Sequence, residues 1–170
     1  MSEFRVFVTV GTDHHIFGRL LEWIGRWAVA HPDATVVVQH GAGPLPTGCE
    51  GYESLTMDEM REQISAATAV ICSCGPGGVM DARELGRLPI AVPRLARYGE
   101  HVDDHQVAFA RHLDQHGIAR GAQDESQLTA LLDEAQRHPD RFLIEPATAG
   151  PQPSGIRAVG ELVDQLAWRT

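Results

Sequence analysis

A chain of 170 residues, 43% of them hydrophobic, is long enough to bury the core of one ordinary globular domain. Its formal charge of -9 argues against non-specific attraction to nucleic acid or to an anionic membrane surface, because both need basic patches. No apolar run approaches the roughly 18 residues of a membrane span, and the apolar part of the N-terminus is too short for a secretory signal. These features predict a soluble protein with no nucleic-acid partner.

The three cysteines, Cys49, Cys72 and Cys74, form an odd set, which is typical of a reducing compartment rather than of a disulfide framework. Cys72 and Cys74 are spaced C-x-C rather than C-x-x-C, so a thioredoxin-like redox pair is not expected. We therefore expect a cytoplasmic protein.

Apolar runs alternate with helical patterns along the chain. The first run, at 4–10, predicts a strand, and 17–30 carries apolar residues at helical spacing before a His-Pro pair. Thr56 to Glu59 has the capping-box form T-x-x-E, which predicts a helix from there to about residue 67. The remaining predicted elements are strands at 35–39, 69–73, 88–92 and 118–120, and helices at 79–85, from Asp103 or Asp104 as N-cap to about 116, and at 128–135.

Strands separated by helices predict right-handed crossovers and a mostly parallel sheet covered on both faces. The sequence therefore predicts a doubly wound, Rossmann-like α/β domain over residues 1–144. From residue 145 the composition shifts to Pro, Ala, Gly and Ser, which indicates a linker over 145–155. A terminal helix is predicted over 156–170.

Ligands of open parallel sheets bind beyond the carboxyl ends of the strands, and three polar segments are predicted there: G-T-D-H-H at 11–15, S-C-G-P-G-G at 73–78, and V-P-R-L-A-R-Y-G-E-H-V-D-D-H-Q at 92–106. The glycines of the second segment allow an anion to approach the backbone, and the next helix offers its N-terminal N–H groups to a phosphate. The alternative is a tight turn without a ligand, because the segment is neither a P-loop nor a G-x-G-x-x-G fingerprint. Asp81, one helical turn past Gly77, is within reach of a ribose, although a first-turn carboxylate needs no ligand.

Four histidines fall in the first and third segments. His14 and His15 follow the first strand, and either has a catalytic or substrate-positioning role or is a solvated loop residue. His101 and His105 stand four residues apart, so a metal site is conceivable. Because they straddle the expected start of a helix and would not share a helical face, we predict no metal.

The motifs V-T-V-G-T-D-H-H, C-G-P-G-G-V-M-D-A and V-P-R-L-A-R-Y-G-E-H-V-D-D-H-Q, in this order and spacing, resemble the glycosyltransferase family 28 C-terminal-domain family. The resemblance covers roughly residues 4–121. Within the family the chain is most similar to PssE-type exopolysaccharide glycosyltransferase subunits, which are relatives of the donor-binding half of MurG and of the cytosolic half of the two-subunit enzyme that extends dolichol-linked sugar.

The resemblance implies one half of a GT-B glycosyltransferase split across two chains. This chain would bind a UDP-sugar donor, and a membrane-associated subunit would bring a lipid-linked saccharide acceptor and recruit the chain to the inner face of the membrane. Such enzymes invert the anomeric carbon and need neither a metal nor another cofactor. Carried over by position, the donor-binding residues are Gly11, Thr12, Ser73, Gly75, Gly77, Gly78, Asp81, His105 and Gln106.

In this interpretation Glu100 or His101 faces the acceptor or the partner chain. The general base is not assignable from the sequence and can belong to the other chain; His14 and His101 are the candidate catalytic residues of this one. The family commonly has H-G-G-P-G-[TS] where this chain has S-C-G-P-G-G, so Ser73 replaces the histidine and Gly78 the hydroxyl residue. The lost hydroxyl should weaken donor binding by about 1 kcal/mol.

Three functions follow from the sequence. The first is the donor-binding, catalytic subunit of a polysaccharide glycosyltransferase. The second, suggested by Ser73 and Gly78, is a non-catalytic accessory subunit that enhances or anchors a partner glycosyltransferase. The third, a nucleotide-dependent oxidoreductase, is disfavoured because no dinucleotide fingerprint follows the first strand.

Overall fold

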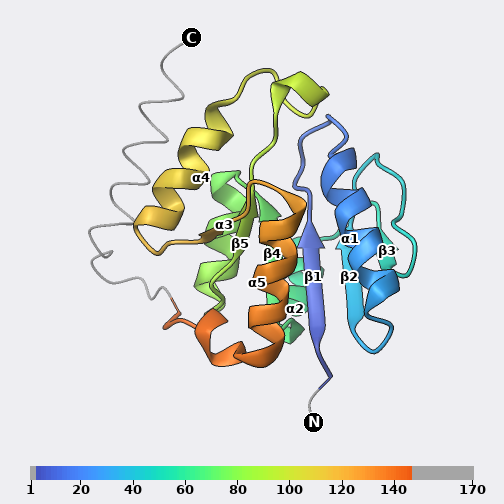
Figure 1. Ribbon diagram of the computed structural model, residues 1–170, viewed down its shortest axis with the longest axis vertical. Helices are drawn as coiled ribbons and strands as arrows, with labels where there is room; N and C mark the ends of the chain where they lie inside the picture. The colour runs from blue at the N-terminus through green and yellow to red at the C-terminus, as the bar shows by residue number, and fades with distance from the viewer. Residues whose placement is uncertain (1–2, 147–170) are drawn as a thin grey trace.

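Six parallel strands form one sheet in the order β3-β2-β1-β4-β5-β6 (Figure 1). The strands are β1 (Arg5–Thr9), β2 (Thr35–Gln39), β3 (Glu50–Tyr52), β4 (Ala69–Ser73), β5 (Ile90–Val92) and β6 (Arg120–Gly121). This computed structural model describes residues 3–146. The predicted linker at 145–155 lies almost wholly outside the described residues, and the predicted helix at 156–170 lies wholly outside them.

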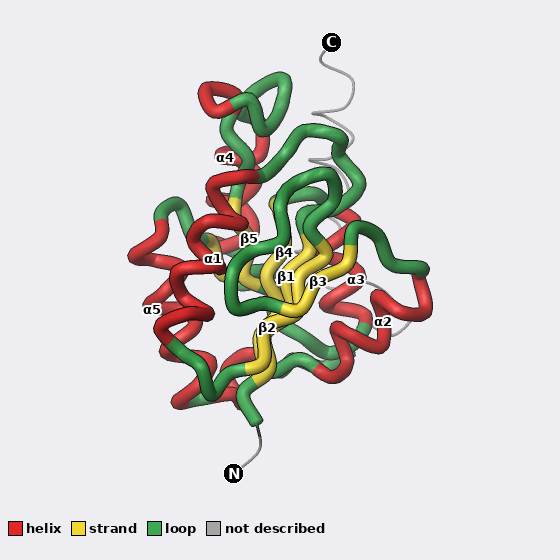
Figure 2. Tube along the Cα trace, turned by 90° about the vertical axis from the view of Figure 1, so that its right-hand side faces the viewer, coloured by secondary structure: helices red, strands yellow, loops and turns green. Residues whose placement is uncertain are grey.

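Within residues 3–146, five α-helices and two 3-10 turns lie between or after the strands. They are α1 (Gly18–Ala30), α2 (Met57–Ala66), α3 (Pro76–Glu84), η1 (Ala96–Tyr98), α4 (His105–Gln115), α5 (Glu125–Arg137) and η2 (Pro139–Phe142). Figure 2 shows α1 and α5 on one side of the strands and α2 and α3 on the other. The sheet is therefore covered on both faces, which confirms the predicted doubly wound α/β fold.

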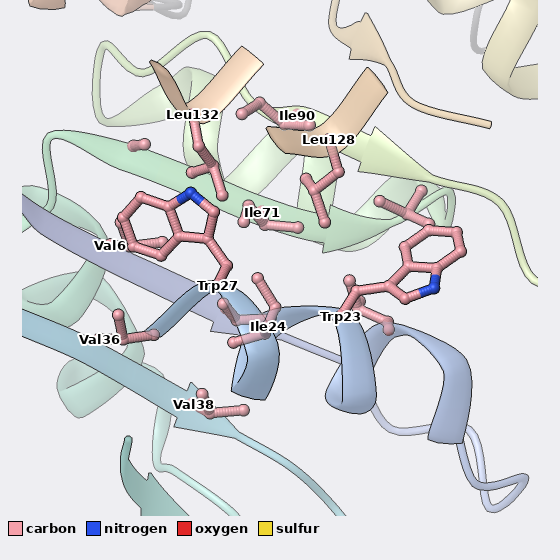
Figure 3. Packing of buried hydrophobic residues seen from close by; sticks show 14 of the residues in the cluster. Val6, Trp23, Ile24, Trp27, Val36, Val38, Ile71, Ile90, Leu128 and Leu132 are labelled. Atoms are coloured by element: carbon pink, nitrogen blue, oxygen red, sulfur yellow. The ribbon is translucent and has the colours of Figure 1, made fainter. Parts of the chain in front are cut away.

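The core follows from the alternation of side chains along each strand, which sends successive residues to opposite faces. Val6 and Val8 of β1 belong to the cluster under α1 and α5, whereas Phe7 packs with residues of α2 and α3. In Figure 3, Trp27 of α1 and Leu132 of α5 lie together over the sheet. A third cluster joins β4 and β5 to α3 and α4. The central strands are apolar on both faces because both are covered.

Most predicted elements are present, with shifts at their ends. The capping box at Thr56 and Glu59 is formed, as predicted. Helix α3 begins at Pro76, earlier than expected, because proline suits the first position of a helix. The exposed edge strand β3 was not predicted, since only three residues take part and a turn-rich segment precedes it.

The strand that comes first in the sequence, β1, lies in the middle of the sheet. β1 pairs with β2 on one side and with β4 on the other, so the order reverses between β1 and β4. Open α/β sheets bind ligands at this switch point, beyond the carboxyl ends of the strands. Across residues 3–146, no helix combines the length and apolar composition that a bilayer span requires.

Candidate functional site

A cleft of about 340 Å³ opens at the switch point, where the chain leaves β1 and β4. All three polar segments contribute to its lining, which comprises Thr9, Val10, Gly11, Thr12, Asp13, Cys72, Ser73, Gly75, Pro76, Gly77, Gly78, Arg94, His101, His105 and Gln106. The cleft contains every predicted site residue except His14 and Asp81. The tertiary structure therefore brings together residues that the sequence only placed at strand ends.

The first turn of α3 forms one wall of the cleft. Gly75 is the N-cap and supplies no side-chain hydrogen bond to the helix end. The N–H groups of Gly77 and Gly78 lie in the first turn and have no acceptor within the helix. A Cβ atom added at Gly77 would meet no heavy atom within 4 Å, so this side of the helix end is open. With the positive end of the helix dipole, these N–H groups form a binding position for an anion.

Gly78 differs from Gly77 in its surroundings. A Cβ atom added at Gly78 would lie 3.3 Å from the Cβ atom of Cys72 in β4. Any side chain at this position therefore requires the strand or the helix to shift. The hydroxyl residue expected from the family resemblance is absent at this position. Glycine there allows α3 to pack closely against β4.

A buried polar network supports the loop after β1. Gly11 has a φ of 78°, in the left-handed region that favours glycine. Its N–H donates to the Thr9 hydroxyl at 3.2 Å, and that hydroxyl donates to Gln39 Oε1 at 2.8 Å. Thr9 and Gln39 were not among the predicted site residues, although each is a polar residue at the end of an apolar strand, which was a usable signal.

Arg94 ties the loop after β1 to the loop after β5. Its guanidinium donates to the backbone oxygens of Val10 (2.7 Å), His15 (2.7 Å) and Glu100 (3.0 Å). Burial lowers the pKa of Arg94, and nearby carboxylates oppose that effect. Because the side chain is 0% exposed, its main role is to hold the cleft-forming loops together.

Glu100 lies in the loop between β5 and α4, and it is buried. Its side chain is almost fully buried and forms an ion pair with Arg19, with 3.0 Å between Nη2 and Oε2. It also accepts the Leu95 N–H at 2.8 Å. The expectation that Glu100 faces an acceptor or a partner is therefore wrong, because its carboxylate is used inside the molecule.

The two candidate catalytic histidines are in different places. His14 is 89% exposed and borders a neighbouring hollow of about 710 Å³ rather than the cleft. His101 lines the cleft, and its Nε2 atom lies 3.5 Å from Asp13 Oδ2. Burial alone would raise the pKa of Asp13, but hydrogen bonds from His15 and the charge of Arg94 outweigh it and lower the pKa.

The start of α4 places His105 and Gln106 in the cleft lining. Asp104 is the N-cap residue, as predicted for one of the two aspartates, but its carboxylate accepts the Ala96 N–H at 2.8 Å instead of a helix N–H. Asp103 accepts the backbone N–H of His105 at 3.0 Å. Gln106 is buried, and its Oε1 accepts the Arg94 N–H at 3.0 Å, which leaves its amide NH₂ group for a ligand.

Asp81 lies in the sixth position of α3, beyond the lining of the cleft. Burial and the charge of Glu84 raise its pKa, and Arg61 opposes the change. The predicted contact with a ribose therefore requires a ligand that extends past the first turn of α3.

The cysteines near the cleft are not poised for thiol chemistry. Burial raises the pKa of Cys72 to about 12 and raises that of Cys74 well above its usual value. Because the thiolate is the nucleophile, these side chains act as small apolar core residues.

Residues 5–158 match the model of the glycosyltransferase family 28 C-terminal domain. The chain belongs to this family. A curated relative, the UDP-N-acetylglucosamine--N-acetylmuramyl-(pentapeptide) pyrophosphoryl-undecaprenol N-acetylglucosamine transferase of Azoarcus sp. (strain BH72), is 28% identical over 124 residues. That alignment covers 71% of the chain and 34% of the relative, so the chain spans about a third of the relative's length.

Solved structures share the fold of the family 28 domain. ALG13 aligns with a TM-score of 0.61 and 17% identity, covering 96% of this chain and 98% of that one. The kitacinnamycin glycotransferase (0.60, 21%) is matched over 98% of this chain and 43% of that one, and MurG of Acinetobacter baumannii (0.58, 20%) over 96% and 50%. The described sheet and helices are those of one half of a GT-B glycosyltransferase. The likeness to PssE-type subunits stays a prediction.

Proposed function

We propose that this chain is the donor-binding, catalytic subunit of an inverting glycosyltransferase that transfers a sugar from a UDP-sugar to a lipid-linked acceptor in polysaccharide biosynthesis. The observation that carries the proposal is the open first turn of α3 around Gly77, at the switch-point cleft. The family match supports a transferase, and the curated relative is named for a UDP-sugar and a lipid-linked acceptor.

The cleft suits a departing nucleoside diphosphate. Negative charge grows on the diphosphate as its bond to the sugar breaks, and the N–H groups of Gly77 and Gly78 at the positive end of α3 stabilise that charge. His105 and Gln106, from the start of α4, contact the sugar or the phosphates. Of the two candidate catalytic histidines, only His101 lines the cleft, so it is the first one to test.

The acceptor site would come from a second, membrane-associated subunit. The chain covers about a third of the curated relative and half of the solved MurG chain, so the acceptor-binding half of such an enzyme has to be supplied by other residues. ALG13 supports a separate subunit, because nearly the whole of that solved chain matches this one.

The test is calorimetric titration of the purified chain, in EDTA, with UDP, UDP-glucose, UDP-glucuronic acid and UDP-N-acetylglucosamine. Gly77→Ala places a methyl group in the space that the diphosphate would occupy. Such a clash costs about 1–3 kcal/mol, so binding should weaken at least about fivefold.

Gly18→Ala is the matched control, since Gly18 also lies in the first turn of a helix and its added Cβ also meets no heavy atom within 4 Å. Both substitutions replace glycine by alanine and so raise the helix propensity by a similar amount. Of the two positions, only Gly77 lines the cleft. Equal donor affinities of the two variants and the wild-type chain would contradict the proposed site.

The non-catalytic accessory subunit is the second candidate, favoured by the close contact at Gly78. The chain lacks the family's hydroxyl residue there, and Cys72 occupies the space beside it. A folded chain that binds its partner subunit, and that binds no UDP-sugar alone or in the co-purified pair, would support this function over the first.

A further inference from the structure

A cluster of potential metal ligands lies at the mouth of the cleft, on the segment that leads into α4. His101, Asp103 and His105 each contribute one ligand atom, and these atoms lie within 4.8 Å of one another. Nδ1 of His105 is hydrogen-bonded to Asp103 Oδ1, and Nδ1 of His101 lies 3.7 Å from the same oxygen. Two imidazole nitrogens therefore converge on one carboxylate oxygen.

The loop brings these histidines together across the start of α4. His105 is the first residue of the helix, and Asp103 accepts its backbone N–H. The rings of His101 and His105 pack edge to face, with 4.7 Å between their centroids. The two histidines straddle the start of α4 and share no helical face, as predicted, but the loop nevertheless brings their rings together. The reason for predicting no metal is thereby removed.

His101 has two features of a metal-bound histidine. Its Nδ1 atom is buried and has no hydrogen-bond partner among residues 3–146. Its other ring nitrogen, Nε2, lies 3.5 Å from Asp13 Oδ2. Metal-bound histidines usually donate their second ring N–H to a carboxylate or carbonyl, which fixes the ring. Asp13 is placed to orient His101 so that Nδ1 faces Asp103.

We propose that His101, Asp103 and His105 bind a divalent transition-metal ion of the Zn²⁺ type. Imidazole together with carboxylate suits Zn²⁺, whereas Mg²⁺ takes oxygen ligands. Zinc–ligand distances are about 2.0–2.2 Å, so a metal ion would replace the direct contact between His105 Nδ1 and Asp103 Oδ1. Three protein ligands leave a fourth position for water or for an oxygen anion, and it adjoins the cleft that His101 and His105 also line.

A second set of potential ligands, Asp13, His14 and His15, is less suitable. In both sets one carboxylate oxygen accepts the backbone N–H of the histidine two residues later and is bonded to its ring nitrogen: Asp13 Oδ1 with His15, and Asp103 Oδ1 with His105. The two sets differ in their other histidine. The His14 side chain is 89% exposed and its ring lies against that of His15, whereas the His101 side chain is 17% exposed. The metal is therefore assigned to the first set, and His14→Asn distinguishes the two.

The test uses the full chain without a polyhistidine tag, stripped of metal with EDTA and dialysed. Zn²⁺ is titrated by calorimetry, and Co²⁺ binding is followed by its visible absorption. The variants are Asp103→Asn, His105→Asn and His14→Asn. The matched control is the double variant His112→Asn/His116→Asn, which removes another adjacent histidine pair, at the C-terminal end of α4.

We expect one Zn²⁺ per chain, with affinity lowered at least about tenfold by Asp103→Asn and by His105→Asn. His14→Asn and the double control should bind as the wild-type chain does, and all variants should keep the wild-type circular dichroism. Equal affinity in every variant, no binding by the wild-type chain, or a loss confined to His14→Asn or to the control would overturn the proposal. The titration contains no nucleotide, so its result is independent of the proposed function.

Discussion

Arg94 is fully buried, yet its guanidinium contacts three backbone oxygens instead of a carboxylate. Its partners Val10 and His15 belong to the loop after β1, and Glu100 to the loop after β5. The cleft lies between these loops, so its width depends on a side chain that does not need to touch a ligand.

Replacing Arg94 should unfold the loops rather than remove a contact to substrate. Arg94→Met leaves three buried backbone carbonyl oxygens without their donor, and should lower the free energy of unfolding by about 3 kcal/mol or more, since each unsatisfied group costs about 1–3 kcal/mol. Arg94→Lys keeps the charge and should cost less. Urea denaturation at pH 7 measures both, with exposed Arg97→Met as the control. Similar midpoints for Arg94→Met and Arg97→Met would show that the guanidinium is not needed for stability.

At the scale of elements, the helix N-termini differ in how they are capped. The Thr56 side chain caps α2 and the Asp124 side chain caps α5, whereas Gly75 gives α3 no side-chain cap. Helices α1 and α4 also lack a side-chain cap. The first turn of α3 is distinguished by lining the cleft through Gly77 and Gly78, so its uncapped N–H groups are the ones proposed for the diphosphate.

The capping box of α2 gives a prediction with a defined pH dependence. Thr56→Ala removes the cap and should destabilise the protein by about 1 kcal/mol at pH 7. Hydrogen bonds from the Thr56 N–H and hydroxyl lower the pKa of Glu59 from its ordinary 4.5. The part of the cap that depends on ionised Glu59 is therefore complete above pH 4.5 and is lost as the pH falls through the lowered value.

Urea denaturation of the wild-type chain and Thr56→Ala at pH 7 and at pH 3 measures this effect. The difference between the two proteins should be smaller at pH 3. Thr47→Ala, in an exposed loop, is the control at both pH values. A difference that grows on acidification would contradict the assigned role of Glu59.

At the scale of the whole molecule, a continuous sheet with helices on both faces predicts one cooperative unit. Ile71, in the central strand β4, is fully buried in the cluster under α1 and α5. Ile71→Ala should lower the free energy of unfolding by about 2–5 kcal/mol, because it leaves a cavity where the sheet meets both helices. Ile16→Ala, at a side chain that is 50% exposed, should change it much less.

Tryptophan fluorescence and far-ultraviolet circular dichroism should report the same unfolding midpoint for Ile71→Ala. Trp23 and Trp27 belong to the same cluster as Ile71, and the third tryptophan, Trp168, lies outside the described residues. In a Trp168→Phe background the fluorescence therefore follows that face, while circular dichroism follows all helices. Two separate transitions would show that the faces of the sheet unfold independently.

The sequence by itself determined the order of all the strands and helices except β3, and the doubly wound class. It predicted a turn over Gly75 to Gly78, of which Pro76 to Gly78 instead form the first turn of α3. These features are local: apolar periodicity, a capping box and a proline at a helix start are each set by residues a few positions apart. For the same reason β3 was missed, because its three residues are held by pairing with β2 and not by a pattern of their own.

Only the tertiary structure decided what the polar residues of the three loops do. Glu100 became the partner of Arg19 and Arg94 a tie between loops, whereas His101 and Asp13 met at the cleft. Their partners lie far away in the sequence and reach one another only because parallel strands end at the same edge of the sheet. A motif can therefore show that such residues gather at this edge, but packing decides which of them stay open to a ligand.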